Sequence, residues 1–90
     1  MKKTIITVVG KDSVGIIAKV CTYLAEKTIN TLDISQSIVD GYFNMMMIVN
    51  MEDATKSFAE ISEELEKMGE EIHCIIRVQR EEIFDKMHRI

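Results

Sequence analysis

The dipeptide Asp40-Gly41 most constrains the fold of this chain, because it lies between two runs of alternating apolar and polar residues. An Asp-Gly pair readily adopts the positive φ angles of a type I′ turn, the commonest connection of a two-residue β-hairpin. The residues on either side, 31–39 and 42–49, are therefore predicted to form two antiparallel strands.

A two-residue turn also sets the register of the hairpin, which starts with Val39 opposite Tyr42. The pairs on one face are Ile38 with Phe43, Gln36 with Met45, Ile34 with Met47, and Leu32 with Val49. Because this face carries most of the apolar side chains, we expect it to contact the core. Met46 and Ile48 then lie on the opposite face.

The segment before the hairpin predicts a strand followed by a helix. Residues 3–9 are rich in β-branched side chains and apolar on both faces, which is typical of a central strand. A helical stripe follows, formed by Ile16, Ile17, Val20, Cys21 and Leu24. Asn30 is expected in the turn between this helix and the hairpin.

The segment after the hairpin predicts a second helix and a fourth strand. The helical stripe consists of Phe58, Ile61, Leu65 and Met68, and the helix is expected to end at Gly69. The strand contains Ile72, Cys74, Ile76 and Val78 at alternate positions. Ile83, Phe84, Met87 and Ile90 recur at helical spacing and predict a short C-terminal helix that packs on the body.

The predicted order β-α-β-β-α-β defines an α+β, ferredoxin-like βαββαβ sandwich. We expect one domain over residues 1–90, with a four-stranded antiparallel sheet, two helices on one face and the short C-terminal helix. The first and third strands would be central. The face without helices carries Ile5, Val9, Met46, Ile48 and Ile75. Either a second subunit covers this face or its apolar residues are scattered surface residues.

Composition excludes several function classes. The net charge of −4 disfavours a nucleic-acid binder, which needs a basic surface. No stretch reaches the roughly 20 apolar residues of a membrane span. The apolar run behind the basic N-terminus stops at Gly10 and is followed by two charged residues, which disfavours a signal peptide. We therefore expect a cytoplasmic protein, with Cys21 and Cys74 as reduced core thiols.

The chain lacks a recognisable catalytic constellation. His73 and His88 are the only histidines and are expected on the surface. Ser13 and Thr31 have no evident activating base. The acidic residues gather at 60–71, as on a solvated helix face. The sequence thus predicts a protein that is not an enzyme and uses no cofactor or metal.

The loop Gly10-Lys11-Asp12-Ser13-Val14-Gly15 joins the first strand to the first helix. Its glycines allow a sharp turn and a close approach of the backbone. Asp12 or Ser13 can cap the helix, and the N–H groups beside them form an anion site. Such a junction suits the carboxylate of a small ligand.

The pattern T-I-I-T-V-V-G-K-D-S-V-G-I-I-A-K-V, followed by T-I-N-T-L-D-I-S-Q-S, resembles the ACT domain over essentially the whole chain. This resemblance implies a regulatory module that binds small molecules, typically amino acids. The chain is most similar to free-standing bacterial proteins with a single ACT domain, and to the ACT halves of glycine-cleavage-system repressor-like proteins.

The resemblance also implies that a ligand would sit between two subunits, held by the first loop of one chain and by residues near the start of the second strand. The matching positions are Asp12, Ser13, Val14, Gly15, Ile16, Asn30, Thr31 and Leu32. Loop N–H groups would receive the ligand's carboxylate, and Asn30 or Asp12 would hold its amino group. Alternatively, Asp12 only caps the helix, Gly15 only allows close packing, and Asn30 only takes a positive φ.

The expected function is an amino-acid-sensing homodimer that regulates a separate partner protein, because the chain carries no catalytic domain of its own. The alternative is a ligand-free interaction or dimerisation module in transcriptional or metabolic regulation. Side-by-side and face-to-face arrangements of the two sheets both remain open. No contact with nucleic acid or membrane is expected.

Overall fold

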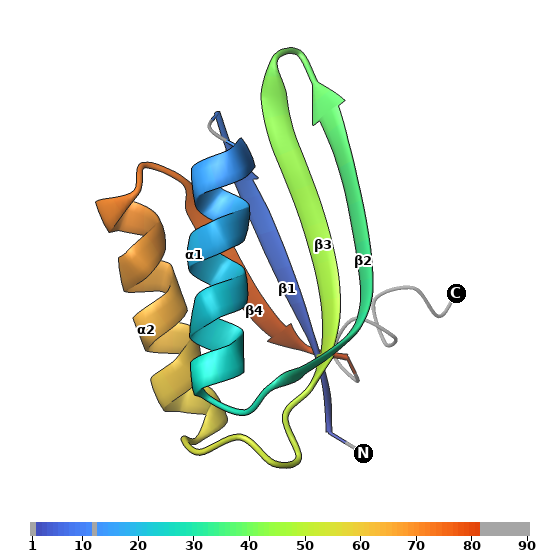
Figure 1. Ribbon diagram of the computed structural model, residues 1–90, viewed down its shortest axis with the longest axis vertical. Helices are drawn as coiled ribbons and strands as arrows, with labels where there is room; N and C mark the ends of the chain where they lie inside the picture. Colours follow the sequence, from blue (N-terminus) through green and yellow to red (C-terminus); the bar gives the residue numbers. More distant parts are fainter. Residues whose placement is uncertain (1, 12, 82–90) are drawn as a thin grey trace.

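The computed structural model describes residues 2–11 and 13–81. The elements are β1 (Lys3–Gly10), α1 (Ser13–Glu26), β2 (Asn30–Val39), β3 (Tyr42–Asn50), α2 (Phe58–Glu71) and β4 (Ile75–Arg80) (Figure 1). The sheet is antiparallel with the order β2-β3-β1-β4, so β1 and β3 are central as predicted. The βαββαβ fold is thereby confirmed. The predicted C-terminal helix falls on 83–90, outside the described residues.

The core lies between the helices and one face of the sheet. It contains Ile6 and Val8 of β1, Phe43, Met45, Met47 and Val49 of β3, Ile16, Val20 and Leu24 of α1, and Ile61 and Leu65 of α2. Met47 is completely buried, whereas its neighbour Met46 is 38% exposed on the opposite face. This alternation confirms the predicted orientation of β3.

The hairpin turn has the predicted geometry, with φ angles of 53° at Asp40 and 79° at Gly41. The predicted register holds from Val39–Tyr42 to Ile34–Met47. The expected pair of Leu32 with Val49 is wrong. The register shifts between Thr31 and Asp33, and Thr31 lies opposite Val49. Leu32 is therefore the extra residue of a β-bulge, a feature common at sheet edges that strict alternation cannot predict.

The expected burial of β2 is also wrong. All ten residues of this strand are exposed, including Ile34 at 42% and Ile38 at 74%. Within the described residues, the core cluster takes side chains from β1, β3 and β4 but none from β2. Figure 1 shows β2 at the outer edge of the sheet, beyond α1. The two helices cover the other strands and leave β2 uncovered.

The predicted stripe of α1 needs one correction. Ile16, Val20 and Leu24 are buried and Ile17 packs against them, but Cys21 is exposed. Cys21 follows Ile16 by five residues, which places it at the border of the apolar face. Only Cys74 is the core thiol that the sequence predicts.

The end of α1 explains the position of Asn30. The N–H of Ile29 donates to the carbonyl of Leu24 at 2.9 Å, and Thr28 has a φ of 58°. This pattern is a Schellman motif with threonine in the left-handed position usually taken by glycine. Asn30 is therefore neither a turn residue nor a positive-φ residue; it opens β2, opposite Asn50.

The end of α2 also differs from the prediction, and it too has a residue other than glycine in the left-handed position. The helix continues past Gly69 to Glu71, and His73 adopts the left-handed conformation with a φ of 60°. The N–H of Cys74 donates to the carbonyl of Gly69 at 2.8 Å, which again closes a Schellman motif. His73 is thus an exposed turn residue, and β4 begins only at Ile75.

Gly69 is needed for packing rather than for helix termination. A Cβ atom at this position would lie 2.9 Å from the carbonyl oxygen of Cys74 and 3.0 Å from Cγ1 of Ile76. The absence of a side chain therefore lets α2 approach β4 closely.

Candidate functional site

The loop between β1 and α1 is the first half of the predicted ligand site. Asp12 and the side chain of Ser13 lie outside the described residues, so their capping role stays a prediction. Val14, in the first turn of α1, is 78% exposed. The helix begins at Ser13, and its first N–H groups therefore belong to this loop.

Close packing holds this loop against the core. A Cβ atom at Gly10 would lie 2.5 Å from Cδ1 of Ile16 and 2.7 Å from Cβ of Cys74. Ile16 is only 2% exposed. Its side chain therefore supports the loop from the core, and only its backbone is available to a ligand.

The second half of the predicted site, Asn30 to Leu32, lies at the other end of the molecule. Gly10 is opposite Phe43 and Phe43 is opposite Ile38, so the loop and the end of β2 are neighbours across the sheet. The start of β2 instead lies beside Asn50 and Lys3. The 14 residues of α1 span about 21 Å between the two halves. A single chain therefore does not bring them together around one small ligand.

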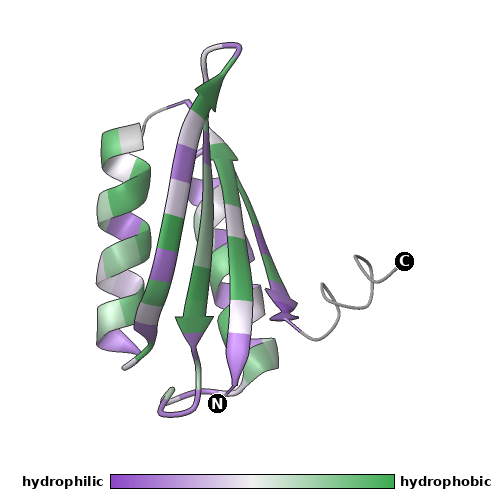
Figure 2. Cartoon of the chain, turned by 90° about the vertical axis from the view of Figure 1, so that its right-hand side faces the viewer, coloured by the Kyte–Doolittle hydropathy of each residue, from purple (hydrophilic) through white to green (hydrophobic). Residues whose placement is uncertain are grey.

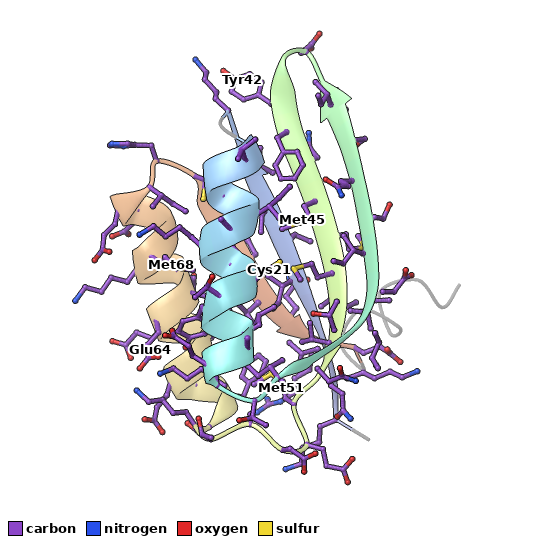
Figure 3. The ribbon with its side chains drawn as sticks, viewed as in Figure 1. Cys21, Tyr42, Met45, Met51, Glu64 and Met68 are labelled. Atoms are coloured by element: carbon purple, nitrogen blue, oxygen red, sulfur yellow. The ribbon has the colours of Figure 1, made fainter. Side chains whose placement is uncertain are left out.

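The loop end of the molecule carries exposed apolar side chains. They are Val14 of α1, Ile38 and Val39 of β2, and Tyr42 of β3. Tyr42 lies at this end of the molecule (Figure 3). The ammonium of Lys11 lies 5.5 Å from the centroid of the Tyr42 ring, within the range of a cation–π contact. The sequence alone does not predict this contact, which follows from the observed pairing of Gly10 with Phe43, the neighbour of Tyr42.

The bare face of the sheet holds further apolar residues at the predicted positions. The register places Ile5, Met46 and Ile48 on one face with Val9 and Ile75. Ile75 is 58% exposed and Val9 37%, whereas Ile5 is almost fully buried between Ile48 and Gln79. In Figure 2 the strands face the viewer, with one helix beside them and the other behind, and apolar and polar positions alternate along them.

A cluster of ionisable groups joins the two helices. The Tyr23 hydroxyl donates to Oε1 of Glu64 at 2.6 Å, and the Lys56 ammonium contacts Oε2 at 2.5 Å. Burial and the Glu64 carboxylate raise the pKa of Tyr23. The phenol therefore stays protonated, and the cluster acts as a structural clamp.

The described residues contain no evident catalytic or metal site. Burial raises the pKa of the Cys74 thiol, which makes it a poor nucleophile. Within 2–11 and 13–81, no three or more His, Cys, Asp or Glu side chains are grouped so that they could hold a metal. None of the helices described is both long and apolar enough to cross a membrane.

Comparison with known proteins gives consistent matches. Residues 2–79 match the ACT domain family. A UPF0237 protein of Bifidobacterium longum is 62% identical over 90 residues, with complete coverage of both chains. The structure of an ACT domain protein from Streptococcus pneumoniae superposes with a TM-score of 0.81 and 42% identity, covering 92% of this chain and 93% of that one.

A more distant structure, described as a glycine cleavage system transcriptional repressor, superposes with a TM-score of 0.73 and 20% identity. The match covers 88% of this chain and 45% of that protein. At this identity the likeness concerns the fold alone. Both parts of the predicted resemblance, to single ACT domain proteins and to this repressor, are thus found.

Proposed function

Because the chain belongs to the ACT domain family and to the UPF0237 proteins, we propose that it binds a small amino acid as a homodimer and regulates a separate partner protein. The observation that carries the proposal is the separation of Asn30 from the β1–α1 loop within one chain. If both belong to one site, the site needs two copies of the chain.

The exposed edge of β2 is the surface proposed for this dimer. An unpaired strand edge with exposed apolar side chains is a template for pairing with another strand. Antiparallel pairing of two β2 strands about a two-fold axis would place the start of one strand beside the end of the other. Asn30 of the partner subunit would then lie at the same end of the dimer as Val14 and the first loop.

The chemistry at this junction suits an amino acid. The N–H groups and the positive end of the α1 dipole favour a carboxylate. The Asn30 side-chain oxygen can accept a hydrogen bond from the ligand's ammonium group. Gly10 and Ile16 keep the loop against the core, and Val14 offers an apolar contact for the ligand's side chain. Thr31 and Leu32 would border the site from the partner's strand.

The second candidate function is a dimerisation or interaction module without a ligand. It is favoured by the exposed apolar side chains of β2 and of the bare face, which a second subunit or a partner protein would cover whether or not an amino acid binds. In either case the activity that is regulated resides in another protein.

A thermal-shift screen of the full chain against the amino acids tests the proposal. A ligand at about 100 times its Kd stabilises the native state by roughly 2.7 kcal/mol, which raises the Tm of a domain this small by about ten degrees. Asn30→Ala should remove most of the shift and leave the Tm of the free protein nearly unchanged, because Asn30 is exposed.

Gln79→Ala is the matched control, since it also removes an exposed amide from a strand but lies on β4, away from the proposed site. Its ligand response should equal that of the unaltered protein. If no amino acid raises the Tm of the unaltered chain, the ligand-free module becomes the better description.

A further inference from the structure

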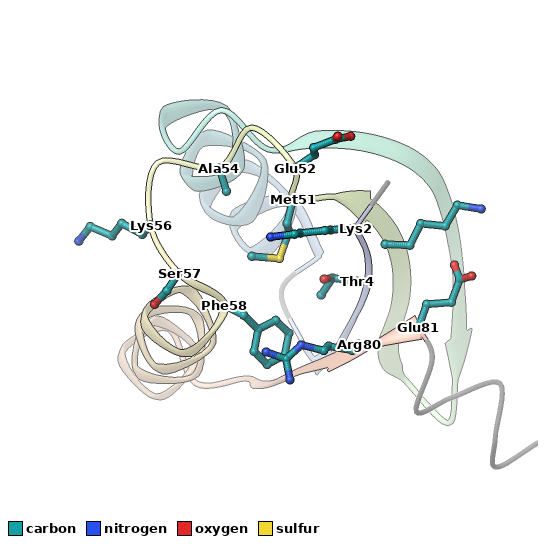
Figure 4. A pocket seen from close by; sticks show the side chains of 11 residues that line it. Lys2, Thr4, Met51, Glu52, Ala54, Lys56, Ser57, Phe58, Arg80 and Glu81 are labelled. Carbon is teal, nitrogen blue, oxygen red and sulfur yellow. The ribbon is translucent and has the colours of Figure 1, made fainter.

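A pocket of about 770 Å³ lies at the end of the molecule opposite the β1–α1 loop. Three segments form its walls: the start of β1, the connection from β3 to α2, and the end of β4 (Figure 4). The lining residues are Lys2, Lys3, Thr4, Met51, Glu52, Ala54, Lys56, Ser57, Phe58, Arg80 and Glu81. This pocket shares no residue with the site proposed above.

Thr4 is the polar residue at the centre of the pocket. It is 2% exposed, and its side chain lies in the middle of the ring of lining residues in Figure 4. Among the described residues, its hydroxyl has no hydrogen-bond partner. No buried side-chain oxygen or nitrogen in 2–11 or 13–81 lacks a hydrogen-bond partner, so this hydroxyl is not sealed in the core but reaches the solvent of the pocket. The Thr4 hydroxyl is therefore available to a molecule that occupies the pocket.

The lining is predominantly basic, with four cationic side chains and two carboxylates. Lys56 is committed to Glu64, but neither Lys2 nor Arg80 forms an ion pair with a carboxylate in 2–11 or 13–81. The Arg80 guanidinium lies 4.3 Å from the centroid of the Phe58 ring. This stacking fixes the guanidinium plane, which reduces the loss of side-chain entropy when it binds an anion.

The start of α2 adds to the positive potential. Ser57 and Phe58, its N-cap and first residue, both line the pocket. The N-cap is already satisfied by the capping box with Glu60, so the helix contributes the field of its dipole rather than free donors. Met51 and Ala54 supply an apolar wall beside these groups.

We propose that this pocket binds a small molecule through its phosphate group. The phosphate oxygens contact the Lys2 ammonium, the Thr4 hydroxyl and the Arg80 guanidinium, and the organic part rests on Met51 and Phe58. Phosphate fits these groups because it carries nearly two negative charges and offers several acceptors to two cations and a hydroxyl. Glu52 and Glu81 oppose any anion, so the contacts from Lys2 and Arg80, neither of which is paired with a carboxylate, are essential.

Inorganic phosphate is the probe for the first test, titrated into the full chain at constant ionic strength with chloride as the balancing anion. Backbone amide NMR signals of Thr4 and Phe58 should shift and saturate. Thr4→Val and Arg80→Gln should each raise the apparent Kd about tenfold or more, the loss expected for a charge-assisted hydrogen bond.

Arg77→Gln is the matched control. It removes the same charge from the same strand, but Arg77 lies outside the pocket, 4.0 Å from Glu66. Its phosphate affinity should equal that of the unaltered chain. Thr4→Val should also keep the Tm, because the hydroxyl it removes has no partner among the described residues.

Two outcomes would overturn the proposal. Amide shifts that never saturate would show that phosphate has no site here. Equal weakening by Arg77→Gln and Arg80→Gln would show that the response follows net charge alone. Asn30→Ala should leave phosphate binding unchanged, so this test is independent of the amino-acid site.

Discussion

Tyr23 on α1 donates a hydrogen bond of 2.6 Å to Glu64 on α2, which joins the two helices outside the core. The Lys56 ammonium holds the other oxygen of the same carboxylate. Hydrogen bonds from Lys56 and Tyr23 lower the pKa of Glu64, while burial and Glu64 raise that of Tyr23. The clamp is therefore strongest where Glu64 is ionised and Tyr23 is protonated.

The first prediction concerns the pH dependence of this clamp. Because the pKa of Glu64 is lowered in the folded state, its stabilisation is present above its ordinary value of 4.5 and is lost as the pH falls through the folded value. When the free energy of unfolding is measured in urea, it should fall less steeply at acid pH in Glu64→Gln than in the unaltered chain. Glu63→Gln, a change at the exposed neighbour, should leave this pH dependence unchanged.

Tyr23→Phe tests the other partner. Loss of this hydrogen bond should lower the free energy of unfolding at neutral pH by about 0.5–1.5 kcal/mol. The raised pKa of Tyr23 also means that its stabilisation is lost as the pH rises above its ordinary value of 10.0. Tyr23→Phe should therefore lose less stability than the unaltered chain at alkaline pH. Parallel curves for the two proteins would contradict this role.

The third prediction uses the two faces of β3. Met47 is fully buried and Met46 is 38% exposed on the other face. Met47→Ala should lower the free energy of unfolding by roughly 2–5 kcal/mol, because it leaves a cavity in the core. Met46→Ala should cost much less in the isolated monomer, so chemical denaturation of dilute protein is the measurement. A larger loss for Met46→Ala would contradict the register.

The hairpin and the central strands could be predicted because their determinants are local. Asp40-Gly41 specifies its turn by backbone chemistry, and the alternation of Met45, Met46 and Met47 follows from strand geometry alone. The exposure of Ile34 could not be predicted in this way. It depends on how far the helical layer extends over the sheet, which no short stretch of sequence encodes.

The helix ends show a second limit. Glycine is the usual residue in the left-handed position after a helix, so the sequence predicts that α2 ends at Gly69. The chain uses Thr28 and His73 there instead. The candidate site shows a third limit: the sequence points to the first loop and to Asn30, but their separation along α1 emerges only from the topology.

The fourth prediction concerns Gly69. Alanine normally stabilises a helix interior relative to glycine by about 1 kcal/mol. Here the added methyl would lie 2.9 Å from a backbone oxygen, so either α2 or β4 must shift. Gly69→Ala should therefore lower the Tm, whereas Glu63→Ala on the exposed face of the same helix should leave it nearly unchanged. A raised Tm for Gly69→Ala would show that the contact relaxes without cost.

The last prediction distinguishes the two dimer geometries by a matched pair of substitutions. Ile34 on β2 and Met46 on β3 are similarly exposed, at 42% and 38%, but lie on opposite faces of the sheet. Side-by-side pairing of two β2 strands would bring Ile34 close to its copy in the partner. Ile34→Asp would then place like charges near one another and should raise the dimer Kd about tenfold or more. Met46→Asp should leave that dimer largely intact, because its side chain points to the bare face. Sedimentation at concentrations on the order of tens of micromolar measures both variants. If Met46→Asp dissociates the dimer and Ile34→Asp does not, the two sheets pack face to face. If the unaltered chain is a monomer, both the proposed dimer and the two-subunit ligand site are contradicted.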